Sequence, residues 1–304
     1  MTVDRTFIDK LQRSLPSARV LVDEPMDKHT TFRIGGKADC LVYPSDIDDI
    51  RTIFAVAKEA DIPVTVLGNG SNVLVSDRGI RGIVLCFDAA FADIKLSGKN
   101  LTVQAGAILG AVSQFAAQHS LSGLEFAVGI PGSMGGAIFM NAGAYDGEMK
   151  NVVTAVTALT VDGELKKYVA ADLELGYRHS IFQSNGEIIC EVEMTLEAGD
   201  EAAIKEKMAG FTERRLTKQP LELPSAGSTF KRPTGYFAGT LIEQAGLKGF
   251  AVGGAQVSKK HAGFVVNTGG ATAEDVLNLI KEVQKRVRDK FNVELEPEVR
   301  VIGE

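Results

Sequence analysis

Apolar residues along the chain recur with two different periods, one typical of α-helices and the other typical of β-strands. Spacings of three and four residues predict helices over these segments: 45–59, 106–118, 201–211, 239–245 and 272–288. Alternating or continuous apolar runs predict strands over these segments: 37–44, 62–68, 72–88, 152–168, 187–197, 260–267 and 292–303. Helices and strands are mixed along the whole chain, which indicates an α+β fold.

Two of the predicted helices have a polar residue suited to their N-terminus. Ser45 precedes the first helical stripe and is the expected cap of that helix. Thr272, followed three residues later by Asp275, predicts a capping box at the start of the last helix.

Two strand regions carry more specific signals. Asp162-Gly163 interrupts the run 152–168 and predicts a β-hairpin there. The closing segment 292–303 alternates with period two, which predicts one strand with an apolar face and a solvated charged face. The predicted apolar face consists of Val293, Leu295, Val299 and Val301, and the charged face of Glu294, Glu296, Glu298 and Arg300.

Length and composition narrow the class of protein. At roughly 150 residues per domain, 304 residues predict two domains, and the segment 198–200 is the expected boundary. The net charge of −6 argues against non-specific nucleic-acid binding, which needs a basic surface. The first residues contain Asp4 and Asp9 and lack the apolar core of a signal peptide, and the long uncharged stretches are broken by polar residues, glycine or proline. We therefore expect a cytoplasmic protein without membrane insertion.

The cysteines do not indicate a metal site. Cys40, Cys86 and Cys190 are far apart and lie in strand-like runs, without a CxxC pair or a histidine at ligand spacing. We expect three buried free thiols, no bound metal and a reducing compartment.

Glycine is the unusual feature of the composition, with 32 residues of 304. The segment 66–79 contains Gly68 and Gly70 but has Val73 where a dinucleotide fingerprint needs a third glycine, so it predicts either a tight turn or an anion-binding loop. The segment 129–145 is too apolar for a linker and too rich in glycine for a regular helix. It predicts either a tightly packed crossing or close backbone contact with a ligand, and the presence of two such segments favours a nucleotide cofactor.

Individual polar residues carry weaker signals. Arg178 precedes an apolar pair, Ser228 lies in a glycine turn, and Glu298 belongs to the charged face of the last predicted strand. Each has an ordinary structural role as its alternative: a surface arginine, a turn serine and a solvated glutamate. The chain contains no Walker A, GxSxG or HExxH motif.

In chain order, seven segments together resemble the UDP-N-acetylenolpyruvoylglucosamine reductase (MurB) family of flavoenzymes. They are TTFRIGG (30–36), LGNGSNVLVSD (67–77), GIPGSMGGAIFMNAGAY (129–145), YRHSIF (177–182), KQPLELPSAGSTFKRP (218–233), KHAGFVVN (260–267) and LEPEVRVIGE (295–304). The match spans nearly the whole chain. Its short C-terminal part is similar to the compact type II enzymes of this family.

This resemblance implies an FAD-binding domain of the vanillyl-alcohol-oxidase (PCMH) type over residues 1–198, with subdomains at about 1–67 and 68–198. A smaller α+β substrate domain would follow over residues 199–304. FAD would bind non-covalently, although His29 lies beside the first matching segment. The implied FAD-binding residues are Leu67, Gly68, Asn69, Gly70, Ser71, Asn72, Gly129, Pro131, Gly132, Ser133, Gly135, Gly136, Ala142 and Gly143.

The resemblance also implies a reaction in peptidoglycan precursor synthesis, and so a part in cell-wall biogenesis, cell shape and cell division. NADPH would reduce FAD and leave, and the enolpyruvyl ether of UDP-N-acetylglucosamine would then be reduced to UDP-N-acetylmuramate by hydride from flavin N5. Arg178 would stabilise the charge that develops on the carboxylate. Glu298, with a pKa raised by burial, would hydrogen-bond the enol form, and Ser228 would donate the proton.

Three further residues are implied to contact the substrate. Lys218 would face the diphosphate or the phosphates of NADPH, and Arg300 and Tyr145 would contact the substrate. Two alternatives stay open: an FAD-dependent sugar-hydroxyl oxidase of the same fold, and a non-catalytic FAD-binding protein. An oxidase would use O2 and ignore NADPH, whereas a scaffold would not need Arg178, Ser228 and Glu298 together. We expect a monomer.

Overall fold

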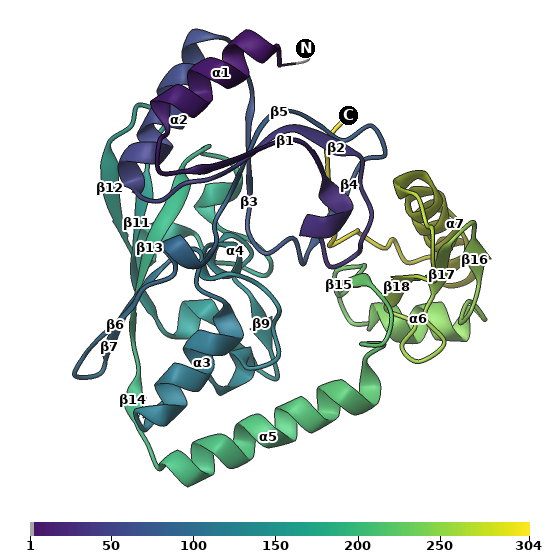
Figure 1. Cartoon of the computed structure of the whole chain (residues 1–304). Helices are drawn as coiled ribbons and strands as arrows, with labels where there is room; N and C mark the ends of the chain where they lie inside the picture. The colour runs from purple at the N-terminus through teal and green to yellow at the C-terminus, as the bar shows by residue number, and fades with distance from the viewer. Residues whose placement is uncertain (1–2) are drawn as a thin grey trace. The chain divides into compact units, whose positions relative to one another are not determined.

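The computed structural model describes residues 3–304, and contacts between residues divide them into two units (Figure 1). The first unit contains residues 3–22, 40–69 and 82–215, and the second contains residues 23–39, 70–81 and 216–304. The chain therefore passes several times from one unit to the other.

The elements have the following bounds. The α-helices are α1 (Arg5–Ser14), α2 (Ile47–Glu59), α3 (Leu109–Gln118), α4 (Met134–Phe139), α5 (Glu201–Lys218), α6 (Ala238–Gln244) and α7 (Ala273–Phe291). The strands are β1 (Arg19–Pro25), β2 (Lys37–Tyr43), β3 (Val64–Leu67), β4 (Val73–Val75), β5 (Ile80–Cys86), β6 (Ile94–Ser97), β7 (Asn100–Gln104), β8 (Leu121–Ser122), β9 (Gly143–Ala144), β10 (Gly147–Glu148), β11 (Val153–Leu159), β12 (Leu165–Val169), β13 (Ile188–Thr195), β14 (Glu197–Ala198), β15 (Ser225–Ser228), β16 (Ala251–Val252), β17 (Ala255–Val257), β18 (Phe264–Asn267) and β19 (Arg300–Ile302). Short 3₁₀ helices span Met26–His29, Ala89–Phe91, Glu125–Ala127, Met149–Asn151, Ala170–Leu173 and Ile181–Gln183.

One sheet, most of whose residues belong to the first unit, has the strand order β1-β2-β5-β3, with β3 parallel to β5. Helices α1 and α2 contact each other, and their apolar residues belong to one core cluster with those of the sheet. Helix α2 is capped by Asp46, whose carboxylate accepts the N–H of Asp49, so the expected cap at Ser45 is wrong by one residue. Ser45 instead donates its own N–H to the Asp49 carboxylate.

The second sheet of this unit is antiparallel throughout and has the order β12-β11-β13-β7-β6. The predicted hairpin is confirmed, because β11 and β12 pair around Asp162-Gly163. Gly163 has a φ of +83° in this turn, a conformation that favours glycine.

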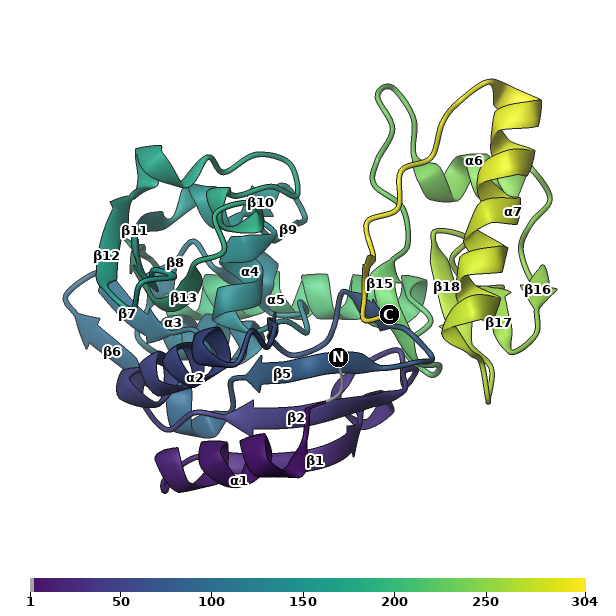
Figure 2. The same ribbon diagram turned by 90° about the horizontal axis from the view of Figure 1, so that it is seen from above.

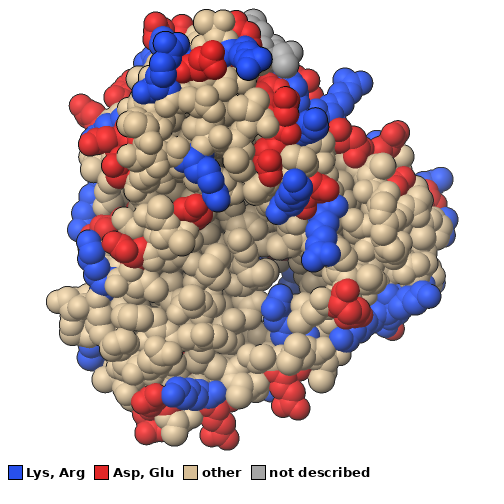
Figure 3. All heavy atoms as spheres, in the orientation of Figure 1, with Lys and Arg blue, Asp and Glu red and all other residues tan. Residues whose placement is uncertain are grey.

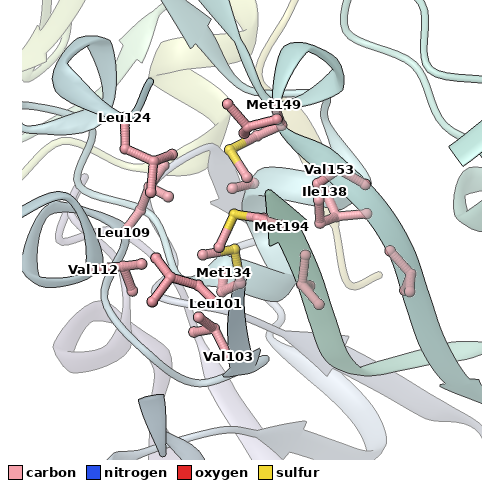
Figure 4. Packing of buried hydrophobic residues seen from close by; sticks show 14 of the residues in the cluster. Leu101, Val103, Leu109, Val112, Leu124, Met134, Ile138, Met149, Val153 and Met194 are labelled. Carbon is pink, nitrogen blue, oxygen red and sulfur yellow. The ribbon is translucent and has the colours of Figure 1, made fainter. Parts of the chain in front are cut away.

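Helix α4 corrects an expectation for the segment 129–145, whose glycine content argued against a regular helix. Residues 134–139 are helical, with Ser133 as the N-cap. Two helical glycines cost about 1 kcal/mol each relative to alanine, but burial of Met134 and Ile138 contributes about 1.5–3 kcal/mol each. Figure 4 shows both side chains in the cluster that contains Leu101 and Met194 of the sheet. Burial therefore outweighs the cost of the glycines.

Helix α3 and most of α5, up to Arg215, belong to the same unit. Helix α3 begins at Leu109, later than the predicted start at residue 106. The N–H of Gly106 donates to the carbonyl of Phe91, at the end of the 3₁₀ helix Ala89–Phe91. Helix α5 confirms the predicted helical segment, and its Ile204 and Met208 are buried with Ala117 of α3.

The second unit contains an antiparallel sheet of order β15-β18-β17-β16 and the helices α6 and α7. Figure 2 shows α7 beside this sheet, which it contacts through β16 and β17. The buried stripe of α7 faces this core: Val276, Leu279, Ile280, Val283 and Val287. Thr272 and Asp275 form the predicted capping box.

The end of the chain differs from the single strand predicted over 292–303. Strand β19 contains residues 300–302 and pairs in parallel with β4 of the same unit. Leu295 and Val299 are buried as expected, but the Val301 side chain is 50% exposed. The alternation of buried and exposed residues does not continue through the whole segment, because only residues 300–302 pair in a sheet.

The three cysteines are buried and free, as the sequence predicted. Among residues 3–304, no helix is long and apolar enough to span a membrane. On the face drawn in Figure 3, acidic and basic side chains are interspersed, which agrees with the near-balanced charge of the sequence.

Candidate functional site

The two glycine segments meet in the first unit. Gly68 follows β3, and a Cβ placed there would lie 2.6 Å from Ser133 Oγ. The Asn69 side chain donates to the carbonyl of Pro131 at 2.6 Å. The backbone of Gly68 therefore passes close to the Ser133 side chain, which would have to shift to admit a larger residue at position 68.

The second glycine segment is fixed by its own hydrogen bonds. Ser133 Oγ accepts the N–H of Gly136 at 3.3 Å, and the N–H of Gly135 donates to the carbonyl of Ala105 at 2.8 Å. The carbonyl of Gly132 accepts the N–H of Leu109. Both alternatives predicted for this segment involve close packing, and a Cβ at Gly135 would lie only 3.1 Å from Ala105 Cβ, a tight contact.

A buried thiol contacts the backbone of the first glycine segment. Cys86 Sγ lies 3.6 Å from the carbonyl of Gly68, to which it donates. Burial raises the pKa of the Cys86 thiol to about 11, so the thiol is protonated at neutral pH and keeps its hydrogen-bond donor. The sequence did not indicate this contact, because it joins residues on different elements.

The residues present fit FAD. Gly68 and Asn69 on one segment, and Gly129, Pro131, Gly132, Gly135 and Gly136 on the other, are exposed or partly buried and belong to one unit. Glycine-rich backbone of this kind offers N–H groups to phosphates and leaves room for close approach of a nucleotide. Ala142 and Gly143 continue from α4 into β9, next to this segment in the chain.

The hairpin β9–β10 carries Tyr145 at its tip. Tyr145 has a φ of +51° and stacks on Phe211 of α5, with ring centroids 4.4 Å apart and planes at 2°. Its hydroxyl donates to the Phe211 carbonyl at 3.1 Å. On the next turn of α5, Arg215 lies against Gly129, and burial lowers the pKa of its guanidinium.

Arg178 also belongs to the first unit and is partly buried. It lies in a turn closed by reciprocal hydrogen bonds between Gly176 and His179. Its Nη2 donates to the carbonyl of Gly143 at 3.4 Å, so the guanidinium lies at the base of the β9–β10 hairpin.

Between Asn69 and Gly70 the chain passes into the second unit, so the predicted FAD-binding run 67–72 is divided. Gly70 has a φ of +59°, and a Cβ there would lie 2.0 Å from the His29 carbonyl. Asn72 donates to the carbonyl of Glu298 at 3.2 Å, and its own carbonyl accepts the N–H of Arg300 at 3.0 Å. Ser71, between them, is partly buried.

Ser228 and Glu298 come together on neighbouring segments of the second unit. Ser228 ends β15 and is exposed, and Glu298 is partly buried. The N–H of Glu298 donates to the carbonyl of Thr229 at 2.8 Å, and Phe230 forms a β-bridge with Pro297. These backbone contacts place the serine and the glutamate beside each other, although 70 residues separate them.

The remaining candidates are less closely grouped. Lys218 at the end of α5 and Arg300 in β19 are both exposed in the second unit. His29 pairs with Glu24 in this unit, with 2.9 Å between Nε2 and Oε1. His179 is exposed, and its Nε2 is 3.9 Å from the Glu174 carboxylate.

Sequence reasoning missed two amide side chains around Arg178, namely Asn141 and Gln183. Asn141 is fully buried and donates to Gly176, while Gln183 donates to the carbonyl of Arg178. Asn141 could have been noticed in the sequence, because it is a polar residue between the apolar run 137–140 and Ala142.

Comparison with known proteins identifies both parts of the chain. Residues 38–168 match the family model described as FAD binding domain. Residues 219–302 match the one described as UDP-N-acetylenolpyruvoylglucosamine reductase, C-terminal domain. Together these matches cover most of the chain.

Relatives and solved structures agree with these matches. The UDP-N-acetylenolpyruvoylglucosamine reductase of Agathobacter rectalis is 52% identical, covering 99% of this chain and all of that protein. The one of Alkaliphilus oremlandii is 51% identical over 97% of each chain. The crystal structure of the MurB reductase from Thermus caldophilus superposes with a TM-score of 0.80 and 36% identity, covering 93% of this chain and 98% of that one.

A more distant structure, an alkyldihydroxyacetonephosphate synthase, shares the fold over 65% of this chain with a TM-score of 0.50 and 16% identity. The fold is thus the α+β architecture with a PCMH-type FAD-binding domain that the sequence predicted. Given full-length relatives at about half identity, this chain belongs to the UDP-N-acetylenolpyruvoylglucosamine reductase (MurB) family.

Proposed function

We propose that this chain reduces the enolpyruvyl group of UDP-N-acetylglucosamine enolpyruvate to UDP-N-acetylmuramate, as the UDP-N-acetylmuramate dehydrogenase of peptidoglycan precursor synthesis. The observation that carries this function is the full-length relationship to reductases, together with the meeting of two glycine segments in the FAD-binding unit. Bound FAD, reduced by NADPH, supplies the hydride that adds to the terminal alkene carbon of the substrate. A sugar-hydroxyl oxidase is not favoured, because the relatives covering nearly the whole chain are reductases.

We assign the positive charge of the site to Arg178. Addition of hydride to an enol ether that bears a carboxylate places negative charge on that carboxylate, so a fixed cation there lowers the barrier. A guanidinium can hold both carboxylate oxygens at once. The contact of Arg178 Nη2 with Gly143 supports this role, because it restrains the guanidinium beside the glycine-rich segment.

We assign proton transfer to Ser228 and the hydrogen bond to the enol form to Glu298. The two residues are brought together by the Thr229–Glu298 and Phe230–Pro297 backbone contacts of the second unit. A serine is a weak acid, but the carbon that accepts the proton is strongly basic and water can restore the hydroxyl. The exposure of Ser228 supports this exchange with water.

The other assignments follow the same proposal. FAD binds non-covalently through residues 67–72, 129, 131–133, 135, 136, 142 and 143. The FAD-binding domain over 1–198 and the substrate domain over 199–304 are functional domains in this proposal, and their bounds differ from those of the two compact units. Lys218, Arg300 and Tyr145 contact the substrate or NADPH. The His29–Glu24 pair supports dissociable FAD, since it gives this imidazole a partner other than the flavin. The protein acts as a monomer in the cytoplasm.

Substitution Ser228→Ala tests the assignment of the proton donor. Reduction of the flavin by NADPH should keep its rate, whereas reoxidation by the enolpyruvyl substrate should slow by about 10²-fold or more, the contribution typical of a general acid. Both half-reactions can be followed anaerobically by flavin absorbance in a stopped-flow instrument.

Ser225→Ala is the matched control, because Ser225 begins the same strand three residues earlier. Its half-reactions should both match the wild type. An unchanged reoxidation rate in Ser228→Ala would remove this serine from the mechanism.

A further inference from the structure

Arg178 has a backbone conformation that few arginines adopt. It is the third residue of the turn 176–179, in which each of Gly176 and His179 donates its N–H to the carbonyl of the other at 3.2 Å. The φ of Arg178 is +54°, in the left-handed region. Since a Cβ disfavours this region, the conformation persists where neighbouring groups impose it.

Two amide side chains donate hydrogen bonds to carbonyls of this turn, namely those of Gly176 and Arg178. The Nδ2 of Asn141 donates to the carbonyl of Gly176 at 2.9 Å. The Nε2 of Gln183 donates to the carbonyl of Arg178 at 3.0 Å, and also to the carbonyl of Phe139 at 2.8 Å. The turn is thus fixed at its first residue and at the arginine itself.

Asn141 has no exposed surface and uses its whole side chain in this arrangement. Its Nδ2 also donates to Glu148 Oε2 at 2.9 Å, and its Oδ1 accepts the N–H of Lys150 at 3.0 Å. A buried amide with all three contacts satisfied has one orientation. Asn141 therefore connects the turn that carries Arg178 to β10.

The guanidinium of Arg178 lies at the other side of the same hairpin. Its Nη2 donates to the Gly143 carbonyl of β9, and its Cζ lies 5.2 Å from the centre of the Tyr177 ring. Gly143 pairs with Glu148 across the hairpin. Residues 141–148 therefore contact Arg178 in two ways: Asn141 holds the turn that carries it, and Gly143 accepts a hydrogen bond from its guanidinium.

We propose that Asn141 and Gln183 are positioning residues for Arg178, which set its left-handed backbone and so fix the direction of the guanidinium. This inference rests on the proposed role of Arg178 in holding the substrate carboxylate. Both amides contact backbone carbonyls, those of Gly176 and Arg178. Their effect reaches the reaction through the carbonyls of Gly176 and Arg178.

The test is Gln183→Met, which keeps the length of the side chain and removes both of its donors. Ser180→Ala is the matched control, because the Ser180 hydroxyl donates to the same Phe139 carbonyl at 2.8 Å but not to Arg178. We expect Gln183→Met to slow reoxidation by the enolpyruvyl substrate about tenfold, with flavin reduction by NADPH within twofold of wild type. Ser180→Ala should leave both rates within twofold.

A double-variant cycle separates positioning from general loosening. The Arg178→Ala variant has no guanidinium to position, so adding Gln183→Met to it should change the rate of reoxidation by less than twofold. If Gln183→Met does not retain FAD, Asn141→Asp takes its place in the same cycle. That variant keeps the size of the side chain but presents a carboxylate oxygen to the Gly176 carbonyl and to Glu148.

The outcomes are distinct. Equal loss from Gln183→Met with and without Arg178 would overturn the inference, as would an unchanged rate in Gln183→Met beside a slow Arg178→Ala. An unchanged rate in Arg178→Ala would instead overturn the proposed role of Arg178, and the inference with it. Slowing confined to reoxidation and to chains that contain Arg178 would establish both.

Discussion

At the scale of single residues, Arg178→Lys separates the charge of this side chain from its shape. A lysine keeps the positive charge but loses the planar fork that binds both oxygens of a carboxylate. We expect kcat with the enolpyruvyl substrate to fall by about 10–100-fold, which is the loss of one or two charge-assisted hydrogen bonds in the transition state. Steady-state turnover of NADPH at saturating substrate measures this effect.

Arg51→Lys, on the exposed surface of α2, provides the control for a general effect of replacing arginine. It should leave turnover unchanged. Wild-type turnover in Arg178→Lys would show that Arg178 does not hold the carboxylate through its fork.

Single residues also show where the sequence was sufficient and where it was not. Arg178, Ser228 and Glu298 could be proposed because short segments around them match a family. The contacts that fix the positions of these residues could not be predicted from the sequence. Asn141 donates to Gly176, 35 positions away, and the N–H of Glu298 donates to the carbonyl of Thr229, 69 positions away. Such pairs are set by packing and leave no periodic pattern in the sequence.

At the scale of elements, the first turn of α7 makes the stability of the protein depend on pH. The backbone N–H groups of Thr272 and Gly254 donate to the Asp275 carboxylate and lower its pKa. Because the pKa in the folded protein lies below that in the unfolded chain, this carboxylate stabilises the fold above the unfolded pKa. The contribution is lost as the pH falls through the folded pKa.

Asp275→Asn tests this dependence. At neutral pH the variant should be less stable by about 0.3–1 kcal/mol, the range for an acidic side chain near a helix N-terminus. The difference should shrink as the pH falls from about 5 toward 2, because the wild-type carboxylate becomes protonated. Urea unfolding of both proteins across this range measures it, and a difference independent of pH would contradict the account.

Elements with a strong local signal were predicted well. The stripe of α7 with its capping box and the hairpin at Asp162-Gly163 depend on residues close together in the sequence. Helix α4 was missed because burial of Met134 and Ile138 outweighs the propensity of its glycines. Strand β19 is shorter than predicted because its partner β4 supplies three paired positions.

At the scale of the whole molecule, no local pattern in the sequence indicates that residues 23–39 and 70–81 belong with the C-terminal third of the chain. Phe32, Ile34 and Leu74 enter the apolar core that α6 and α7 also build. Asp77 accepts the N–H groups of Ala273 and Glu274 at the start of α7. These interactions join distant parts of the sequence, so they appear in the folded chain and not in its local patterns.

In the whole protein, electrons pass from NADPH through FAD to an enolpyruvyl ether. The most direct measurement is the visible spectrum of the purified protein under anaerobic conditions, first alone, then with NADPH, and then with UDP-N-acetylglucosamine enolpyruvate. We expect a yellow protein that bleaches with NADPH and regains its colour on addition of the substrate. A protein that cannot take up FAD, or a yellow protein that NADPH does not bleach, would show that this reaction is wrong for the chain.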